Sequence, residues 1–173
     1  MFQAAHYSES EMLRDGRPLE IRALAPADQP ALLAAVNRSS SQTLYRRFFG
    51  AKRRFSEKEI AFFMNPDFVN HVALVAVAEE RGSPAIVGGG RYVVVQPGTA
   101  ELAFFVVDEY QGQGIGAALM RRLTMIARRA GLKELTAEVL PDNGPMLGLF
   151  NKCGLHLHTR RDASAVHVSL ALS

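Results

Sequence analysis

The sequence has a single cysteine, Cys153, among its 173 residues. One thiol excludes a framework of intrachain disulfides and a structural zinc site made of several thiolates. No stretch reaches the roughly 18 consecutive apolar residues of a membrane-spanning helix. Residues 1–11 also lack the basic start and the apolar run of a signal peptide. We therefore expect a cytoplasmic protein that does not associate with a membrane.

A strong excess of one charge is also absent. The 20 Lys and Arg residues face 17 Asp and Glu residues, which gives a net charge of +3 at pH 7. The basic residues form no dense stripe with interleaved aromatics of the kind that binds nucleic acid, so no nucleic-acid partner is expected. The mild basic excess fits either a solvated face or an anionic small ligand such as a nucleotide-bearing cofactor.

The composition is that of a folded protein, with 48% hydrophobic and 21% charged residues. The length suits one domain. After a polar leader, the first third of the chain predicts a strand at 19–24, a helix from Pro26 to about Asn37, a second helix over 42–49 and a third that begins with the capping box Ser56–Glu59.

The middle of the chain is rich in Val and Ala and predicts an antiparallel meander with strands at 71–78, 85–95 and 99–107. There is no internal repeat, low-complexity segment or linker. The last third predicts an amphipathic helix over 112–130, a strand at 134–140, a short helix at 143–152 and one or two closing strands within 155–172. Together these elements indicate an α+β fold with a strand–helix–strand unit.

The stretch most informative about function is the glycine loop Gln111-Gly112-Gln113-Gly114-Ile115-Gly116, which follows a strand and opens a helix. Three glycines at alternate positions let the backbone approach a ligand closely, and their N–H groups, with the positive end of the helix dipole, suit a diphosphate. A P-loop is excluded because Ala117-Ala118 stands where Lys and Ser or Thr are required. A Rossmann fingerprint is excluded because its glycine spacing differs and it does not follow an antiparallel meander.

The pattern Gln111-x-x-Gly114-x-Gly116 after a strand resembles the acyl-CoA signature of the GNAT N-acetyltransferases. Asn143-x-x-Met146-x-x-Leu149-x-x-Lys152-x-Gly154 resembles the downstream strand–helix segment of that family. The resemblance implies a leader at 1–17 and a GNAT domain at 18–173, with a mixed, mostly antiparallel sheet of six to seven strands flanked by about four to five helices. It also implies an N-acyltransferase that uses acetyl-CoA and releases coenzyme A.

Within the family, Ala100–Asp108 with Tyr110-Gln111-Gly112, and also Thr43–Phe49, are most similar to bacterial protein lysine acetyltransferases of the Pat type, which modify acyl-CoA synthetases. This similarity implies a protein lysine as acceptor. A small-molecule amine acetyltransferase shares every cofactor residue and differs only in the acceptor groove, expected at about 37–64. A catalytically silent acyl-CoA sensor is a third alternative, and both a monomer and a homodimer are compatible.

The resemblance also assigns residues to the acyl donor. The strand that ends at Val107 is expected to splay from its neighbour, so that its backbone pairs with the pantetheine arm, while the amides of the glycine loop hold the diphosphate. The residues assigned to the cofactor are Phe105, Val106, Val107, Gln111, Gly112, Gln113, Gly114, Ile115, Gly116, Ala117, Asn143, Met146 and Phe150. The alternative interpretation is a core position for Phe105 and Phe150, and a helix cap for Asn143.

Acyl transfer needs a base, because an amine is protonated at neutral pH and only its free form attacks a thioester. Glu101 is the candidate: it lies six residues before Val107 on the same strand and faces opposite to Leu102 and Phe104. It also matches a glutamate that has this role in Pat-like relatives. A solvated glutamate at a strand start is the alternative interpretation.

Asp108 and Glu109 are rival carboxylates, but they lie in the turn before the glycine loop and are expected to be exposed or capping. Phe150 stands where many family members place a tyrosine that protonates the departing thiolate. The general acid is therefore unassigned, and water or the product ammonium would suffice.

His156, His158 and His167 share the closing segment, but no carboxylate or cysteine accompanies them at a recognised ligand spacing. No metal is therefore expected. Cys153 is expected to pack rather than to act as a nucleophile, since the resemblance implies direct transfer without an acyl-enzyme.

Overall fold

The computed structural model describes residues 3–38 and 56–172, so the helix expected at 42–49 lies outside the described residues. The strands form one sheet in the order β1-β2-β3-β4-β5-β6-β8-β7. Every neighbouring pair is antiparallel except β5 and β6, which are parallel. The strand bounds are β1 Ser8–Met12, β2 Pro18–Ala23, β3 His71–Glu80, β4 Ser83–Gln96, β5 Thr99–Val106, β6 Glu134–Val139, β7 His156–Arg161 and β8 Val166–Ala171.

Four α-helices lie within the described ranges, in agreement with the expected four to five. Their bounds are α1 Gln29–Asn37, α3 Glu57–Met64, α4 Ile115–Arg129 and α5 Gly144–Asn151, with short 3₁₀ turns η1 Ala4–His6, η2 Pro26–Asp28 and η3 Asp108–Tyr110. The capping box at the start of α3 is confirmed: the Glu59 N–H donates to Ser56 Oγ at 3.1 Å, and the Ser56 N–H donates to Glu59 Oε1 at 2.9 Å.

The sheet has eight strands rather than the expected six to seven. The extra strand is β1, which lies inside the segment taken as a polar leader and pairs with β2 along its whole length. It is an edge strand whose side chains are nearly all exposed. A strand exposed on both faces needs no alternation of apolar and polar residues, so the pattern that marks other strands is missing here.

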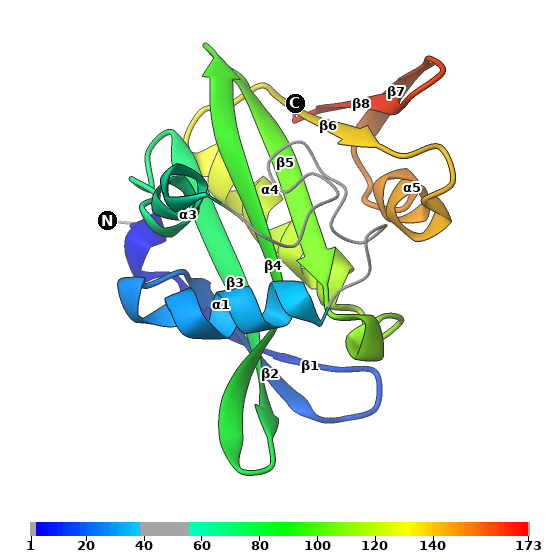
Figure 1. Cartoon of the computed structure of the whole chain (residues 1–173). Helices are drawn as coiled ribbons and strands as arrows, with labels where there is room; N and C mark the ends of the chain where they lie inside the picture. The colour runs from blue at the N-terminus through cyan, green and yellow to red at the C-terminus, as the bar shows by residue number, and fades with distance from the viewer. Residues whose placement is uncertain (1–2, 39–55, 173) are drawn as a thin grey trace.

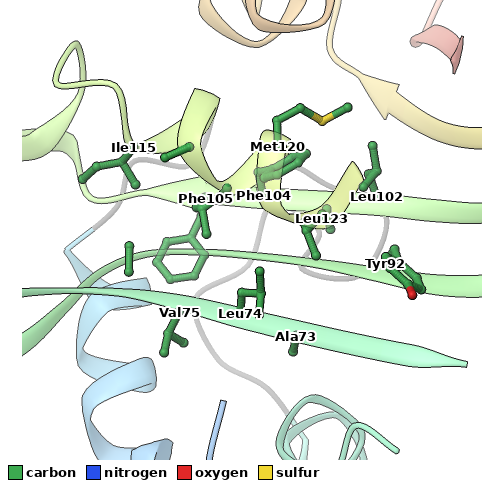
Figure 2. Close-up of a cluster of buried hydrophobic side chains, with 14 of the residues drawn as sticks. Ala73, Leu74, Val75, Tyr92, Leu102, Phe104, Phe105, Ile115, Met120 and Leu123 are labelled. Atoms are coloured by element: carbon green, nitrogen blue, oxygen red, sulfur yellow. The ribbon is translucent and has the colours of Figure 1, made fainter. Parts of the chain in front are cut away.

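Helix α4 covers one face of the sheet, and α1 and α3 lie on the other (Figure 1). On the α4 side, Ile115, Met120 and Leu123 of the helix pack towards Leu102 and Phe104 of β5 (Figure 2). These five side chains are at most 2% exposed. The core between α4 and β5 therefore fixes the strand that leads into the glycine loop.

The glycines of β4 make room for the two large aromatic side chains of β5. A Cβ on Gly90 would lie 2.8 Å from the Phe104 ring, and one on Gly89 would lie 2.8 Å from the Phe105 ring. Since successive residues of a strand point to opposite faces, Phe104 packs beneath α4 while Phe105 packs on the α1 and α3 side. Glu101 shares the face of Phe105, as the sequence predicts.

No helix within residues 3–38 and 56–172 is long and apolar enough to cross a membrane.

Candidate active site

The glycine loop connects η3 to the start of α4. Gly112 and Gly114 have φ angles of 81° and 92°, in the left-handed region that residues with a side chain rarely adopt. Gly114 is also the N-cap of α4, and it has no side chain with which to satisfy the first helical N–H groups. These amides and the positive end of the helix dipole create a site for an anion.

A cavity of about 890 Å³ lies against this loop, α4 and α5. Four basic residues line the cavity: Arg14, Arg121, Arg128 and Lys152. Their positive charge suits an anionic ligand. Most of the residues assigned to the cofactor from the sequence line it: Val106, Gln111, Gly112, Gly114, Ile115, Gly116, Ala117, Asn143 and Met146.

Four residues of the cofactor assignment lie outside this lining. Phe105, Val107 and Phe150 are at most 1% exposed. Phe150 packs against Phe104 with 6.3 Å between ring centroids, which is the core position considered as its alternative. The carbonyl and side chain of Gln113 face the β1–β2 turn, where they accept hydrogen bonds.

The end of α5 that faces the cavity is ordered by Asn143. This residue is 5% exposed and caps α5, with Oδ1 accepting the Met146 N–H at 3.3 Å. The interpretation of Asn143 as a helix cap is therefore confirmed, and Asn143 also lines the cavity. Cys153 lines the same cavity, and its thiol donates to the Phe150 carbonyl at 3.1 Å.

Strands β5 and β6 stay together for only three residue pairs. Their ladder joins Thr99–Glu101 to Glu134–Thr136, after which β5 continues to Val106 while β6 remains paired with β8. The two parallel strands therefore part beyond Glu101, as the resemblance implies. From Leu102 to Val106, within the described residues, β5 has no ladder partner on the β6 side, and its end at Val106 lines the cavity.

Glu101 lies at the point where the strands part. It is 4% exposed, lies opposite Val93 of β4 and Thr136 of β6, and points away from α4. It is therefore a buried carboxyl group and not the solvated glutamate considered as the alternative.

Two further buried polar side chains share the face of Glu101, and the sequence analysis did not identify them. Arg91 of β4 donates from Nη1 to the Phe63 carbonyl at 3.0 Å, and the same atom lies 2.9 Å from His71 Nε2. Burial lowers the pKa of Arg91 to about 9. Burial, followed by the charge of Arg91, lowers the pKa of His71 to about 4. The ring of His71 is therefore neutral at pH 7, and its Nε2 accepts from the guanidinium.

The rival carboxylates are on the surface. Asp108 is exposed at the cavity, and Glu109 is exposed and forms an ion pair with Arg38 at 3.2 Å. In the closing hairpin, His167 lies 2.7 Å from Asp162 and 3.5 Å from Glu138, carboxylates that the sequence analysis did not pair with it. Among the residues that the structure describes, no group of three or more His, Cys, Asp or Glu side chains is arranged to hold a metal.

Comparison with known sequences identifies the family of this chain. The model of the acetyltransferase (GNAT) family matches residues 38–155. Acetyltransferase PA5475 of Pseudomonas aeruginosa is 34% identical over 158 residues, which cover 91% of this chain and 83% of that protein. Acetyltransferase Pat of Mycolicibacterium smegmatis is 32% identical over 144 residues, which cover 82% of this chain and 42% of that protein. The chain thus spans less than half of the length of the latter relative.

The crystal structure of the GNAT domain of S. lividans PAT has a TM-score of 0.83 to this structure and is 29% identical in sequence. The match covers 95% of this chain and 96% of that one, and it confirms the α+β GNAT fold. The family match, the curated acetyltransferases and the shared fold agree with the glycine loop and the parting strands. The chain therefore belongs to the GNAT acetyltransferase family and is an N-acyltransferase.

Proposed function

We propose that this enzyme transfers the acetyl group of acetyl-CoA directly to the side-chain amine of a protein lysine, with Glu101 as the general base. The observation that carries the proposal is the position of Glu101, which is buried where β5 and β6 part. A base there can reach an acceptor on one face of the sheet and a thioester held in the opening between the strands.

The donor side is supported by the glycine loop and its cavity. Acetyl-CoA carries a diphosphate that suits the loop amides and the N-terminus of α4. From Glu101 to Val106 the strand spans about 17 Å at the usual rise per residue. An extended pantetheine arm that pairs with this part of β5 would place the thioester near Glu101 while the diphosphate stays at the loop.

The transfer step follows from this placement. Glu101 accepts a proton from the acceptor ammonium, and the free amine attacks the thioester carbonyl carbon. The carbon–nitrogen bond forms as the carbon–sulfur bond breaks, and the electron pair of that bond leaves with coenzyme A as a thiolate. Phe150 has no hydroxyl group and is buried against Phe104, so the thiolate takes its proton from water or from the product ammonium.

A protein lysine is the proposed acceptor because the GNAT domain of S. lividans PAT and acetyltransferase Pat are similar to this chain over most of its length. An acyl-CoA synthetase is the target class to test, given the similarity of Ala100–Asp108 to the Pat type. We also propose a cytoplasmic location, since such a reaction needs acetyl-CoA and intracellular protein substrates.

The test is steady-state kinetics with acetyl-CoA and two acceptor sets: a folded acyl-CoA synthetase, and free polyamines, aminoglycosides and amino acids. We expect turnover with the protein acceptor. Glu101→Gln should lower kcat by about 10²- to 10⁴-fold, the usual contribution of a general base, and leave the Kd for acetyl-CoA within about twofold of the wild-type value. Glu79→Gln, an exposed carboxylate at the end of β3, is the matched control and should retain full activity.

Each other outcome would change a different part of this proposal. Faster turnover of the free amines would identify a small-molecule acetyltransferase. Tight binding of acetyl-CoA without transfer to any amine would identify a sensor. Retention of more than a third of kcat by Glu101→Gln would remove Glu101 from the base role while leaving the enzyme class intact.

A further inference from the structure

The turn between β1 and β2, residues 13–17, lies outside the residues that the family model matches, so family membership gives it no role. The turn is closed by its own hydrogen bonds: the Leu13 N–H donates to the Arg17 carbonyl at 2.9 Å, and the Gly16 N–H donates to the Leu13 carbonyl at 2.9 Å. Gly16 has a φ of 91°, which favours glycine. The turn is therefore a defined structure rather than a loose connection.

This turn is hydrogen-bonded to the glycine loop at three places. The Arg14 N–H donates to the Gln113 carbonyl at 3.2 Å, and Arg14 Nη1 donates to the Gly112 carbonyl at 3.0 Å. The Asp15 N–H donates to Gln113 Oε1 at 3.2 Å. About 98 residues of chain separate the partners, so these bonds are tertiary contacts made specifically by this turn.

The direction of these bonds matters for the loop amides. A trans peptide group is planar, and its C=O points opposite to the N–H of the next residue; no peptide bond in the described chain is cis. When Arg14 holds the Gly112 and Gln113 carbonyls, the N–H groups of Gln113 and Gly114 are turned away from the β1–β2 turn. Two of the loop amides are thereby oriented before any ligand arrives.

The turn is itself held in place from two sides. Glu11 of β1 accepts from Arg122 at 2.7 Å and from Arg121 at 3.2 Å, which joins the strand to α4. The Arg17 guanidinium lies 5.0 Å above the ring of Tyr110, the residue before the glycine loop. The turn thus contacts both the loop and the element that precedes it, and Arg14 lines the cavity as well.

We propose that the β1–β2 turn is part of the acyl-CoA site, and that Arg14 is a positioning residue that holds the glycine loop in the conformation that binds the diphosphate. The proposal rests on the acyl-CoA assignment under the proposed function and is independent of the acceptor and of Glu101. Its consequence is that part of the donor site is built by residues 13–17, which lie within the segment that the sequence predicts to be a leader.

The test is isothermal titration of the wild type and three variants with coenzyme A and with dephospho-coenzyme A. Arg14→Ala should raise the Kd for coenzyme A about 10-fold, and Gln113→Ala, which removes only an uncharged contact with the turn, about threefold. Both effects should be the same for dephospho-coenzyme A, because the diphosphate is common to the two ligands. The melting temperature without ligand should stay within about 2 °C of the wild-type value, since Arg14 and Gln113 are not core residues.

Arg128→Ala is the matched control, because it removes a basic side chain at the same cavity that donates to the Leu172 carbonyl instead of the loop. We expect it to raise the Kd less than Arg14→Ala does. Equal effects of the two variants would show that only the charge counts and would overturn the positioning role. An Arg14 effect confined to coenzyme A would show a contact with the 3′-phosphate instead, and would also overturn it. Unchanged binding by Arg14→Ala and Gln113→Ala would overturn the proposal alone, whereas no binding by the wild type would overturn the acyl-CoA assignment as well.

Discussion

The two sides of β5 present different chemistry. Towards α4 and α5, the candidate donor site consists largely of backbone: glycines with positive φ, a helix N-terminus and the edge of a parting strand. Towards α1 and α3, the candidate acceptor side presents buried side chains, with Glu101 on β5, Arg91 on β4 and His71 on β3. Backbone amides do not titrate, whereas buried side chains do. The acceptor side should therefore respond to pH, and the donor side should respond to changes in backbone conformation.

The largest of the effects that separate the two sides should be the pH dependence of stability that comes from His71. Its pKa is about 4 in the folded state against 6.5 in the unfolded chain, so between these values the unfolded chain binds the extra proton. Stability must then fall as the pH falls through this window. From pH 7 to 4.5, the free energy of unfolding should decrease by roughly 2–3 kcal/mol on account of this group.

Urea denaturation of the wild type and of His71→Gln across pH 7 to 4.5 measures this effect. Glutamine can still accept a hydrogen bond from Arg91 but does not titrate. The free energy of unfolding of His71→Gln should therefore change less with pH in this range. Carboxylates whose pKa is lowered by ion pairs, such as Asp28 beside Arg22, lose their contribution only at lower pH. If the free energy of unfolding of the two proteins changes equally with pH, His71 is not a buried neutral histidine.

On the donor side, the single methyl group added by Gly114→Ala should be sufficient to weaken the binding of acetyl-CoA. A Cβ on Gly114 would have 3.9 Å to its nearest neighbour, so space is not the obstacle, but its φ of 92° is strained for alanine. At about 1–2 kcal/mol for this strain, Gly114→Ala should raise the Kd for acetyl-CoA by about 5- to 30-fold.

Gly82→Ala provides the matched control. Gly82 has a φ of 81° in the turn between β3 and β4, away from the cavity, and also has open space around it. Gly82→Ala should lose stability and keep its affinity for acetyl-CoA, whereas in Gly114→Ala the loop relaxes when no ligand holds it, so that the strain appears as a loss of affinity. If Gly82→Ala weakens binding as much, the effect at Gly114 reports general destabilisation and not the loop.

Features of the donor side could be predicted from the sequence more readily than those of the acceptor side. The glycine loop, the meander and the capping box at Ser56 are local: the residues that make each feature are close together in the chain, and each leaves a pattern of spacing or residue type. The contact of Arg91 with His71 depends on the register of two strands, which places Ala73 opposite Arg91 and Val93 opposite His71. No local pattern encodes that register.

The first strand was missed for a related reason. Residues 8–12 form a polar segment in the sequence because β1 is an exposed edge strand, and the contact of Arg14 with the glycine loop exists only in the folded chain. An arginine within the apolar run of β4 was a usable signal, since a charged residue in a buried strand needs partners. For Arg14 the sequence offers no comparable signal.

Substitution of Asn143 should give the smallest of these effects. Asn143 is the N-cap of α5 and also lines the cavity, so its effects on stability and on binding can be measured separately. As the N-cap of α5 it should contribute about 1 kcal/mol to stability, so Asn143→Ala should lower the free energy of unfolding by about that amount. Asn143→Ser keeps a capping oxygen and should restore stability, but serine lacks the side-chain NH₂ group of asparagine. If Asn143 also contacts the cofactor, the affinity of Asn143→Ser for acetyl-CoA should remain about threefold below that of the wild type. Calorimetric titration with acetyl-CoA and urea denaturation of the two variants separate the two roles. If serine restores both the affinity and the stability, Asn143 acts as a helix cap alone, because the NH₂ group that serine lacks is then not needed for binding.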